Sequence, residues 1–279
     1  MKLTDKVPSA THRILIYGAP KSGKTQLAAE LSSKYKLIWF DLENGYATLL
    51  KLPAASQERI EIISLPDSKT FPIAIETMLK VVSGNPVDIC EQHGKVSCPL
   101  CKKDNLPTAH VELAKVGQDT VVVVDSLTQL TNSAIAFITK DQPEDYKMDY
   151  SDWIYLKAVV EKFLSQIQQA KYNIVCISHE EEVEMEDGRK KIVPVCGSSK
   201  SSRNTAKYFD HVVYCDVKNR KHGAASSTVF SNNILTGSRT DAVLESAIAP
   251  SLFDIFDQNS RTKSQGQLAL NALKGGLGK

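Results

Sequence analysis

Hydrophobic residues in this chain gather in short continuous runs rather than in strict alternation with polar ones. Each run is bounded by polar or glycine-containing segments, which is typical of a strand buried on both faces of a sheet. The sequence therefore predicts buried strands over residues 13–17, 36–41, 60–64, 121–124, 174–178 and 212–216.

Between several of these runs, apolar residues recur at helical spacing, as Phe71, Ile75 and Met78 do. Because strands and helices alternate, the predicted fold class is α/β, with a mostly parallel sheet between helices. One hairpin is expected over 183–193, because Asp187-Gly188 is a strong two-residue turn signal. The predicted helices are 26–35, 71–83, 127–139 and 153–170.

Two segments depart from the alternating pattern. Residues 84–118 contain glycines, prolines and three of the six cysteines, so they are interpreted as an insertion within a core of residues 1–257. Residues 258–279 are rich in Gln, Asn, Gly, Ser and Lys and contain no acidic residue. They are predicted to form a flexible basic tail.

The composition is that of an ordinary globular protein. The chain has 279 residues, of which 42% are hydrophobic and 24% charged, and the net charge of +2 does not by itself indicate a nucleic-acid binder. No apolar run is long enough to cross a membrane, and the N-terminus lacks the apolar core of a signal peptide. We therefore expect a cytoplasmic protein with no membrane partner and no disulfides.

The segment GAPKSGKT carries the most specific chemical signal. It fits G-x-x-x-x-G-K-[ST] and lies between a predicted strand and a predicted helix, as a phosphate-binding P-loop requires. In such a loop the glycines let backbone N–H groups surround a phosphate, Lys24 acts on the β- and γ-phosphates, and the Thr25 hydroxyl coordinates Mg²⁺. ATP with Mg²⁺ is the predicted ligand, and Lys24 is assigned a catalytic role. The predicted nucleotide-binding residues are Gly18, Ala19, Pro20, Lys21, Ser22, Gly23, Lys24 and Thr25.

Two acidic residues at strand ends are expected to complete a hydrolytic site. Asp125 follows the run VVVV and is predicted to hold Mg²⁺ together with Thr25. Hydrolysis also needs a group that orients the attacking water, and the residue after Asp125 is Ser126 rather than Glu. We therefore predict Glu43, after the second strand, as the catalytic base, with Asp41 as the alternative.

Four segments in order, GAPKSGKT, FDLE, VVVVDSLTQL and NIVCISH, resemble the core of the RecA-type recombinases. The chain looks most like the short RecA-like ATPases encoded by phages, some of which anneal single-stranded DNA. The resemblance implies a RecA-like P-loop NTPase fold and a catalytic role for Glu43. It also implies a γ-phosphate sensor at Ser178 or His179, where the bacterial recombinase has an Asn-Gln pair.

The same resemblance implies partners. Single-stranded DNA, self-association into a ring or filament, and a single-strand-binding or other replication or recombination protein are expected, in the host cytoplasm if the protein is phage-encoded. In such assemblies a cation of one subunit can reach the γ-phosphate of its neighbour. The candidates for DNA contact or for this trans role are Lys200, Arg203, Lys218, Arg220, Lys221 and Arg239.

Two segments, 140–152 and 180–205, would face DNA by this resemblance. Tyr146, Tyr150 and the nearby Trp153 could stack on bases, although the acidic residues of the first segment argue against a phosphate groove. Basic residues are in excess from Val195 to His222, which indicates either a DNA-binding surface or a solvated one.

Residues 90–101 read CEQHGKVSCPLC, with the spacing C-x₂-H-x₄-C-x₂-C. Three thiolates and one imidazole at such spacing are typical of a tetrahedral structural zinc site. A redox-active dithiol in CPLC is the smaller alternative. The insertion around this site could be purely structural, or it could contact DNA or a partner. The predicted Zn²⁺ ligands are Cys90, His93, Cys98 and Cys101.

Two functions from different classes fit these motifs. The first is ATP hydrolysis, stimulated by single-stranded DNA, in phage recombination or annealing. The second is a nucleotide-gated adaptor with little turnover, which docks a partner through the zinc insertion. Nucleotide-kinase activity is disfavoured because no arginine-rich lid is evident and FDLE matches the recombinases.

Overall fold

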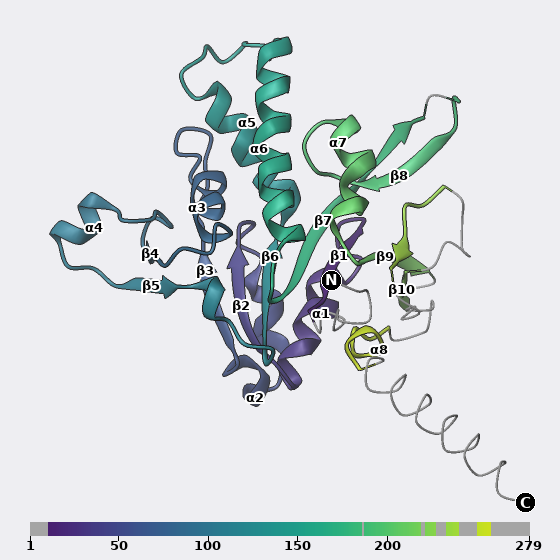
Figure 1. Ribbon diagram of the computed structural model, residues 1–279, viewed down its shortest axis with the longest axis horizontal. Coiled ribbons are helices and arrows are strands. Elements are labelled where there is room, and N and C mark those ends of the chain that lie inside the picture. The colour runs from purple at the N-terminus through teal and green to yellow at the C-terminus, as the bar shows by residue number, and fades with distance from the viewer. Residues whose placement is uncertain (1–10, 186, 219–220, 227–232, 240–249, 258–279) are drawn as a thin grey trace, which may run out of the picture.

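The computed structural model describes residues 11–185, 187–218, 221–226, 233–239 and 250–257. Their central element is a nine-stranded sheet with the main order β10-β9-β1-β7-β6-β2-β3, in which β8 pairs with β7 and β11 with β9 (Figure 1). β4 and β5 form a separate two-stranded sheet. The strands are β1 Arg13–Gly18, β2 Lys36–Asp41, β3 Ile60–Ser64, β4 Val87–Cys90, β5 Thr108–Val111, β6 Thr120–Asp125, β7 Asn173–Glu184, β8 Lys190–Pro194, β9 His211–Lys218, β10 Lys221–Ala225 and β11 Gly237–Ser238.

Helices cover the sheet on both faces, and short 3₁₀ turns join several of the elements. The α-helices are α1 Lys24–Ala29, α2 Ala54–Gln57, α3 Ala74–Val81, α4 Pro99–Lys103, α5 Leu127–Thr139, α6 Tyr150–Gln168, α7 Ser199–Asn204 and α8 Phe253–Phe256. The 3₁₀ helices are η2 Glu30–Ser33, η3 Tyr46–Lys51, η4 Leu113–Lys115 and η5 Thr205–Tyr208.

The predicted α/β class with a mostly parallel sheet is confirmed. β1 pairs in parallel with β7 and β9, β6 with β7 and β2, and β2 with β3. Successive side chains of a strand point to opposite faces, and both faces are buried. Leu15 and Tyr17 therefore join the core beneath α3, α5 and α6, whereas Ile14 and Ile16 join the core beneath α1 and α8.

The register of these strands gathers the predicted chemistry at one edge. Gly18 at the end of β1 is level with His179 of β7. Asp125 of β6 is level with Asp41 of β2 on one side and with Ile177 of β7 on the other. The loops that follow these carboxyl ends meet there, which is where ligands bind in parallel α/β sheets.

Beyond His179, β7 leaves the parallel sheet and continues into an antiparallel hairpin with β8. The pairing of Val183 with Lys191 and of Glu184 with Lys190 confirms the predicted hairpin. Figure 1 shows this hairpin projecting from the body beside α7. Much of the segment 180–205 is thus strand and helix rather than loop.

Two helices differ in their bounds from the sequence pattern. α6 begins at Tyr150, three residues before the predicted start, because Asp149 and Asp152 form a reciprocal capping box. α1 ends at Ala29 and continues as the 3₁₀ turn η2. The predicted tail, 258–279, lies outside the described residues. In the part of the chain that is described, no helix has both the length and the apolar content that crossing a bilayer requires.

Candidate nucleotide-binding site

The loop between β1 and α1 turns sharply because of two glycines. A Cβ on Gly18, whose φ is 152°, would lie 2.2 Å from the carbonyl oxygen of Cys215 on β9. Gly23 has φ 93°, in the region that favours glycine, and immediately precedes α1. The loop therefore packs closely against β9 and directs the first turn of α1 toward the edge of the sheet.

Lys24, the first residue of α1, folds back over the loop. Its Nζ donates to the carbonyl oxygens of Gly18 at 3.0 Å and Ala19 at 2.7 Å. Burial lowers the pKa of the ammonium, and nearby groups, among them the Asp125 carboxylate, oppose this shift. A phosphate oxygen is a stronger acceptor than these carbonyls, so the ammonium is held where it can exchange them for a phosphate.

Thr25 and Asp125, the predicted Mg²⁺ ligands, are in contact. The Thr25 hydroxyl donates to Oδ2 of Asp125 at 3.1 Å. Burial, followed by the charge of Glu43, raises the pKa of Asp125 to about 7. A divalent cation between the two oxygens would offset that repulsion, so the pair suits a hard cation such as Mg²⁺.

Glu43 lies in front of this pair and is held from two sides. Ser126, which follows Asp125 through a cis peptide bond, donates its hydroxyl to Oε1 of Glu43. Nε2 of His179 is 3.4 Å from the same oxygen, and the Glu43 side chain is 31% exposed. A carboxylate fixed at the mouth of a phosphate pocket and still open to solvent can orient a water molecule.

Asp41, the alternative base, has another task. Its carboxylate accepts hydrogen bonds from the backbone N–H groups of Glu43, Gly45 and Tyr46 at 3.0–3.3 Å. The residue is buried, with 1% exposure. Asp41 therefore fixes the turn that carries Glu43, and its carboxylate is committed to the backbone.

The two sensor candidates point in different directions. Ser178 is fully buried, and its hydroxyl donates to the carbonyl oxygens of His179 and Val195. His179 lines the pocket next to Glu43. Because adjacent side chains of a strand face opposite ways, only one of the pair can face the nucleotide, and the structure places His179 there.

These groups line an open pocket of about 360 Å³. It includes three residues that the sequence analysis did not predict: Thr48, Lys51 and His222. Nδ1 of His222 on β10 is 3.1 Å from the carbonyl oxygen of Ser22, against the outer side of the loop. The pocket is lined by Pro20, Lys21, Gly23, Lys24, Thr25, Gln26, Glu43, Thr48, Lys51, Asp125, Ile177, His179 and His222.

The residues fit a nucleoside triphosphate with Mg²⁺. The Ser22 hydroxyl is buried and has no hydrogen-bond partner among the described residues, although it lies inside the loop that would surround a phosphate. Lys24 supplies the positive charge, and Thr25 and Asp125 supply adjacent oxygen ligands. A buried hydroxyl is normally satisfied, so Ser22 is itself an indication of a ligand at this loop.

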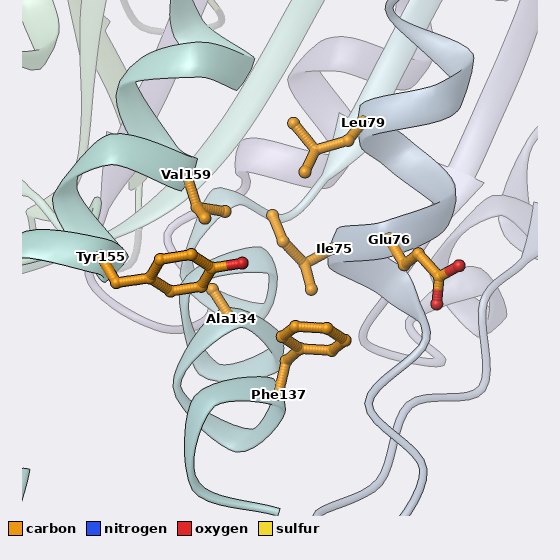
Figure 2. A pocket seen from close by; sticks show the side chains of 7 residues that line it. All are labelled: Ile75, Glu76, Leu79, Ala134, Phe137, Tyr155 and Val159. Carbon is orange, nitrogen blue, oxygen red and sulfur yellow. The ribbon is translucent and has the colours of Figure 1, made fainter. Parts of the chain in front are cut away.

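A second recess, of about 100 Å³, lies between α3, α5 and α6 (Figure 2). Its walls are apolar, with the rings of Phe137 and Tyr155 facing Ile75, while the carboxylate of Glu76 points away from its centre. Without cationic lining residues it is unsuited to phosphate, so the nucleotide site is assigned to the first pocket alone.

The structure separates the candidate DNA-binding or trans-acting cations. Lys200 and Arg203 lie on α7, and Lys221 is exposed on β10 next to His222. Arg239 lies at the opposite, amino-terminal end of β1, where it donates to the carbonyl oxygen of Lys207 and is 3.8 Å from Asp210. The side chain of Lys218 and all of Arg220 lie outside the described residues.

The aromatic residues around the start of α6 also differ from one another. The hydroxyl of Tyr146 donates to Oδ2 of Asp152 at 2.5 Å, which ties it to its own loop. Tyr150 is 83% exposed and Trp153 is 43% exposed. Only the latter two are therefore free to stack on a ligand.

The predicted zinc ligands converge far from the pocket, in the projecting β4–α4–β5 segment of Figure 1. Ligand atoms of Cys90, His93, Cys98 and Cys101 all lie within 4.8 Å of one another. Backbone and side-chain hydrogen bonds lower the pKa of Cys98 to about 6, whereas burial and the neighbouring thiols raise the pKa of Cys101 to about 12. This set could hold a metal ion.

A parallel sheet, a glycine-rich loop entering a helix, and a threonine–aspartate pair across that loop together define a P-loop nucleoside triphosphatase. The chain belongs to the AAA domain family, whose model matches residues 10–240. Nucleotide binding and ATPase activity are properties of this class, with ATP as substrate and Mg²⁺ as its cofactor.

Other comparisons add little to this assignment. No curated protein matches the chain. One similar solved structure is described as a prototypical ATPase from the type III secretion system of pathogenic bacteria. It is 11% identical with a TM-score of 0.43, and the match covers 75% of this chain but only 52% of the other, about half its length.

The raised pKa of Asp125 predicts a pH dependence. Below about 7 the side chain is a neutral carboxyl, and above it a carboxylate, which is the form that binds Mg²⁺. We expect Mg²⁺-dependent nucleotide affinity to rise with pH through this region, by up to about tenfold per unit. Titration calorimetry with ADP in a pH series measures this.

The control is the same series with EDTA in place of Mg²⁺, where Asp125 has no metal to bind. Glu43→Gln should move the midpoint to lower pH, because the Glu43 charge is the second cause of the raised pKa. A Mg²⁺-dependent affinity that does not change with pH would contradict the role given to Asp125.

Proposed function

We propose that this chain is a RecA-like ATPase that acts on single-stranded DNA in recombination or annealing, and that DNA accelerates its turnover. The observation that carries the proposal is the contact between His179 and Glu43. That contact joins the hydrolytic site to the hairpin, the element that by the sequence resemblance would face DNA.

Within the site each side chain has a defined task. Backbone N–H groups of the loop and Lys24 bind and orient the phosphates, and Lys24 counters negative charge that develops during transfer. Thr25 and Asp125 would hold Mg²⁺, which supplies further charge neutralisation when bound. Glu43 orients the attacking water and accepts its proton, while Asp41 keeps the Glu43 turn in place.

His179 lies at the point where β7 changes from parallel to antiparallel pairing. On one side it is level with Gly18, and its own carbonyl accepts from Val195 N at 2.9 Å, just beyond β8. A ligand that shifts the hairpin would therefore move His179 relative to Glu43. We infer that this is how DNA binding changes the hydrolysis rate.

Charge on the hairpin side favours α7 as the phosphate-binding element. On the hairpin itself, Lys190 pairs with Glu182 at 2.7 Å, and Arg189 pairs with Asp187 at 2.6 Å. Lys200 on the adjacent helix is exposed, and Arg203 is half-buried next to it. Replacing both with glutamine should weaken DNA binding and lower its salt slope by about two, one for each lost phosphate contact.

The test is ATP hydrolysis by the whole chain with and without single-stranded DNA. We expect stimulation that is lost at high salt, because DNA binding would release counterions. In His179→Ala the ratio of stimulated to basal rate should fall toward one while DNA affinity stays unchanged. His110→Ala, which removes an exposed histidine of β5, is the matched control and should behave as wild type.

Nucleotide binding without DNA-stimulated turnover would reject this proposal. It would favour the nucleotide-gated adaptor, in which the same pocket acts as a switch and a partner binds elsewhere. Equal stimulation of wild type and His179→Ala would keep DNA as the activator but remove the coupling route through His179.

A further inference from the structure

We propose that Cys90, His93, Cys98 and Cys101 bind one structural Zn²⁺, and that this ion takes the place of a hydrophobic core in the insertion between α3 and β6. Three sulfurs and one imidazole nitrogen within 4.8 Å of one another form the donor set of a closed tetrahedral site. Nδ1 of His93 is 3.1 Å from Sγ of Cys101 and 3.7 Å from Sγ of Cys98.

Local backbone bonds fix both halves of this cluster. Cys90 ends β4, and the turn after it is closed by Gly94 N donating to the Cys90 carbonyl at 2.8 Å. Cys98 precedes α4 and Cys101 lies within it, with Lys102 N donating to the Cys98 carbonyl at 3.0 Å. Each pair of ligands is thus presented by a tight turn, as in zinc knuckles.

The insertion has little else to hold its tip together. Cys90, Cys98 and Cys101 form a buried cluster of their own, separate from the two cores that flank the sheet. The two leucines of this tip, Leu100 and Leu106, are 66% and 37% exposed. Three thiols alone bury too little apolar surface to order such a segment, whereas a bound zinc stabilises small modules of this kind directly.

The ligand turn also fastens the insertion to the body of the protein. The buried hydroxyl of Thr77 on α3 donates to the Gly94 carbonyl at 2.7 Å. Gly94 has φ 64°, and a Cβ there would lie 3.0 Å from Leu65 and from Pro66. Zinc bound at His93 and Cys90 would therefore hold the turn that packs on α3 and on the end of β3.

All four positions are filled by protein, so the ion has no open site for a substrate. None of the four residues lines the nucleotide pocket. The proposal is therefore independent of ATP hydrolysis. A Cys98–Cys101 dithiol is the competing chemistry, but it would leave Cys90 and His93 without a task, and all cysteines are free.

The first experiment measures metal in the purified full-length chain. Elemental analysis should find about one zinc per chain, and cobalt added to the metal-free protein should give the ligand-field and thiolate charge-transfer bands of tetrahedral Cys₃His coordination. Thermal unfolding should move to lower temperature without zinc and return when zinc, but not magnesium, is restored.

Variants locate the site. His93→Ala should weaken zinc retention by at least about 100-fold, since even outer-shell changes reach that range. His110→Ala, in the same insertion and exposed, should retain zinc as wild type does. If the wild type contains no zinc, gives no thiolate–cobalt bands, or forms a Cys98–Cys101 disulfide instead, the proposal is wrong. Because cobalt binding is read on the wild type, misfolding of a variant cannot decide the result.

Discussion

Replacing Lys24 with alanine will weaken Mg²⁺–ATP binding by about 100-fold and reduce hydrolysis to background, because charge-assisted bonds to two phosphates are lost together. Nζ of Lys24 already lies inside the loop, bonded to the carbonyls of Gly18 and Ala19. Binding of a fluorescent ATP analogue and phosphate release measure the two effects separately.

The control for this variant is Lys36→Ala, which removes an exposed lysine at the start of β2, at the other end of the sheet. It loses the same charge and should leave both quantities unchanged. Equal losses in the two variants would mean that overall charge, rather than a phosphate contact, explains the effect.

In Glu43→Gln, ATP binding should persist while kcat falls by about 10²- to 10⁴-fold, the usual contribution of a general base. Glutamine keeps the size of the side chain and can still accept from Ser126, so the geometry of the pocket should survive. Removing a negative charge next to Asp125 should, if anything, improve Mg²⁺–nucleotide binding. Single-turnover hydrolysis and titration calorimetry separate the two quantities.

Glu58→Gln provides the comparison, since Glu58 is exposed and remote from the pocket. Asp41→Asn tests the division of roles between the two carboxylates of the FDLE segment. It should lower both protein stability and kcat, because the Glu43 turn loses its three backbone bonds. Full activity in Glu43→Gln would assign the water-orienting role to another residue.

The sheet and the phosphate loop could be predicted because local signals determine them. Continuous apolar runs bounded by polar residues indicate strands buried on both faces, and the P-loop pattern specifies glycines where close packing requires them. Gly18 shows this directly, since any side chain there would overlap the Cys215 carbonyl. The convergence of Asp125, Asp41 and Gly18 then follows from parallel pairing alone.

The remaining parts of the site depend on tertiary contacts. His222 lies on β10, a short strand at the antiparallel edge whose sequence KHGAA carries no strand pattern, and only its pairing with β9 brings it to the loop. The choice between Ser178 and His179 depends on register, because a shift of one residue exchanges the faces of a strand. Neither signal can be read from the sequence by itself.

The roles of Asp41 and Glu43 illustrate the same limit. Both are carboxylates at the end of one strand, and spacing alone does not rank them. Burial and three backbone donors commit Asp41 to the turn, whereas Glu43 remains open to the pocket. That distinction needs the geometry of the turn after β2.

The most direct test of the account is phosphate release from ATP by the purified wild-type chain, with Lys24→Ala purified in parallel as the blank. The account predicts Mg²⁺-dependent turnover in the wild type that is absent from the blank and from Glu43→Gln. Equal phosphate release from wild type and Lys24→Ala would contradict it, because hydrolysis would then not arise from the site built by Lys24, Thr25, Asp125 and Glu43.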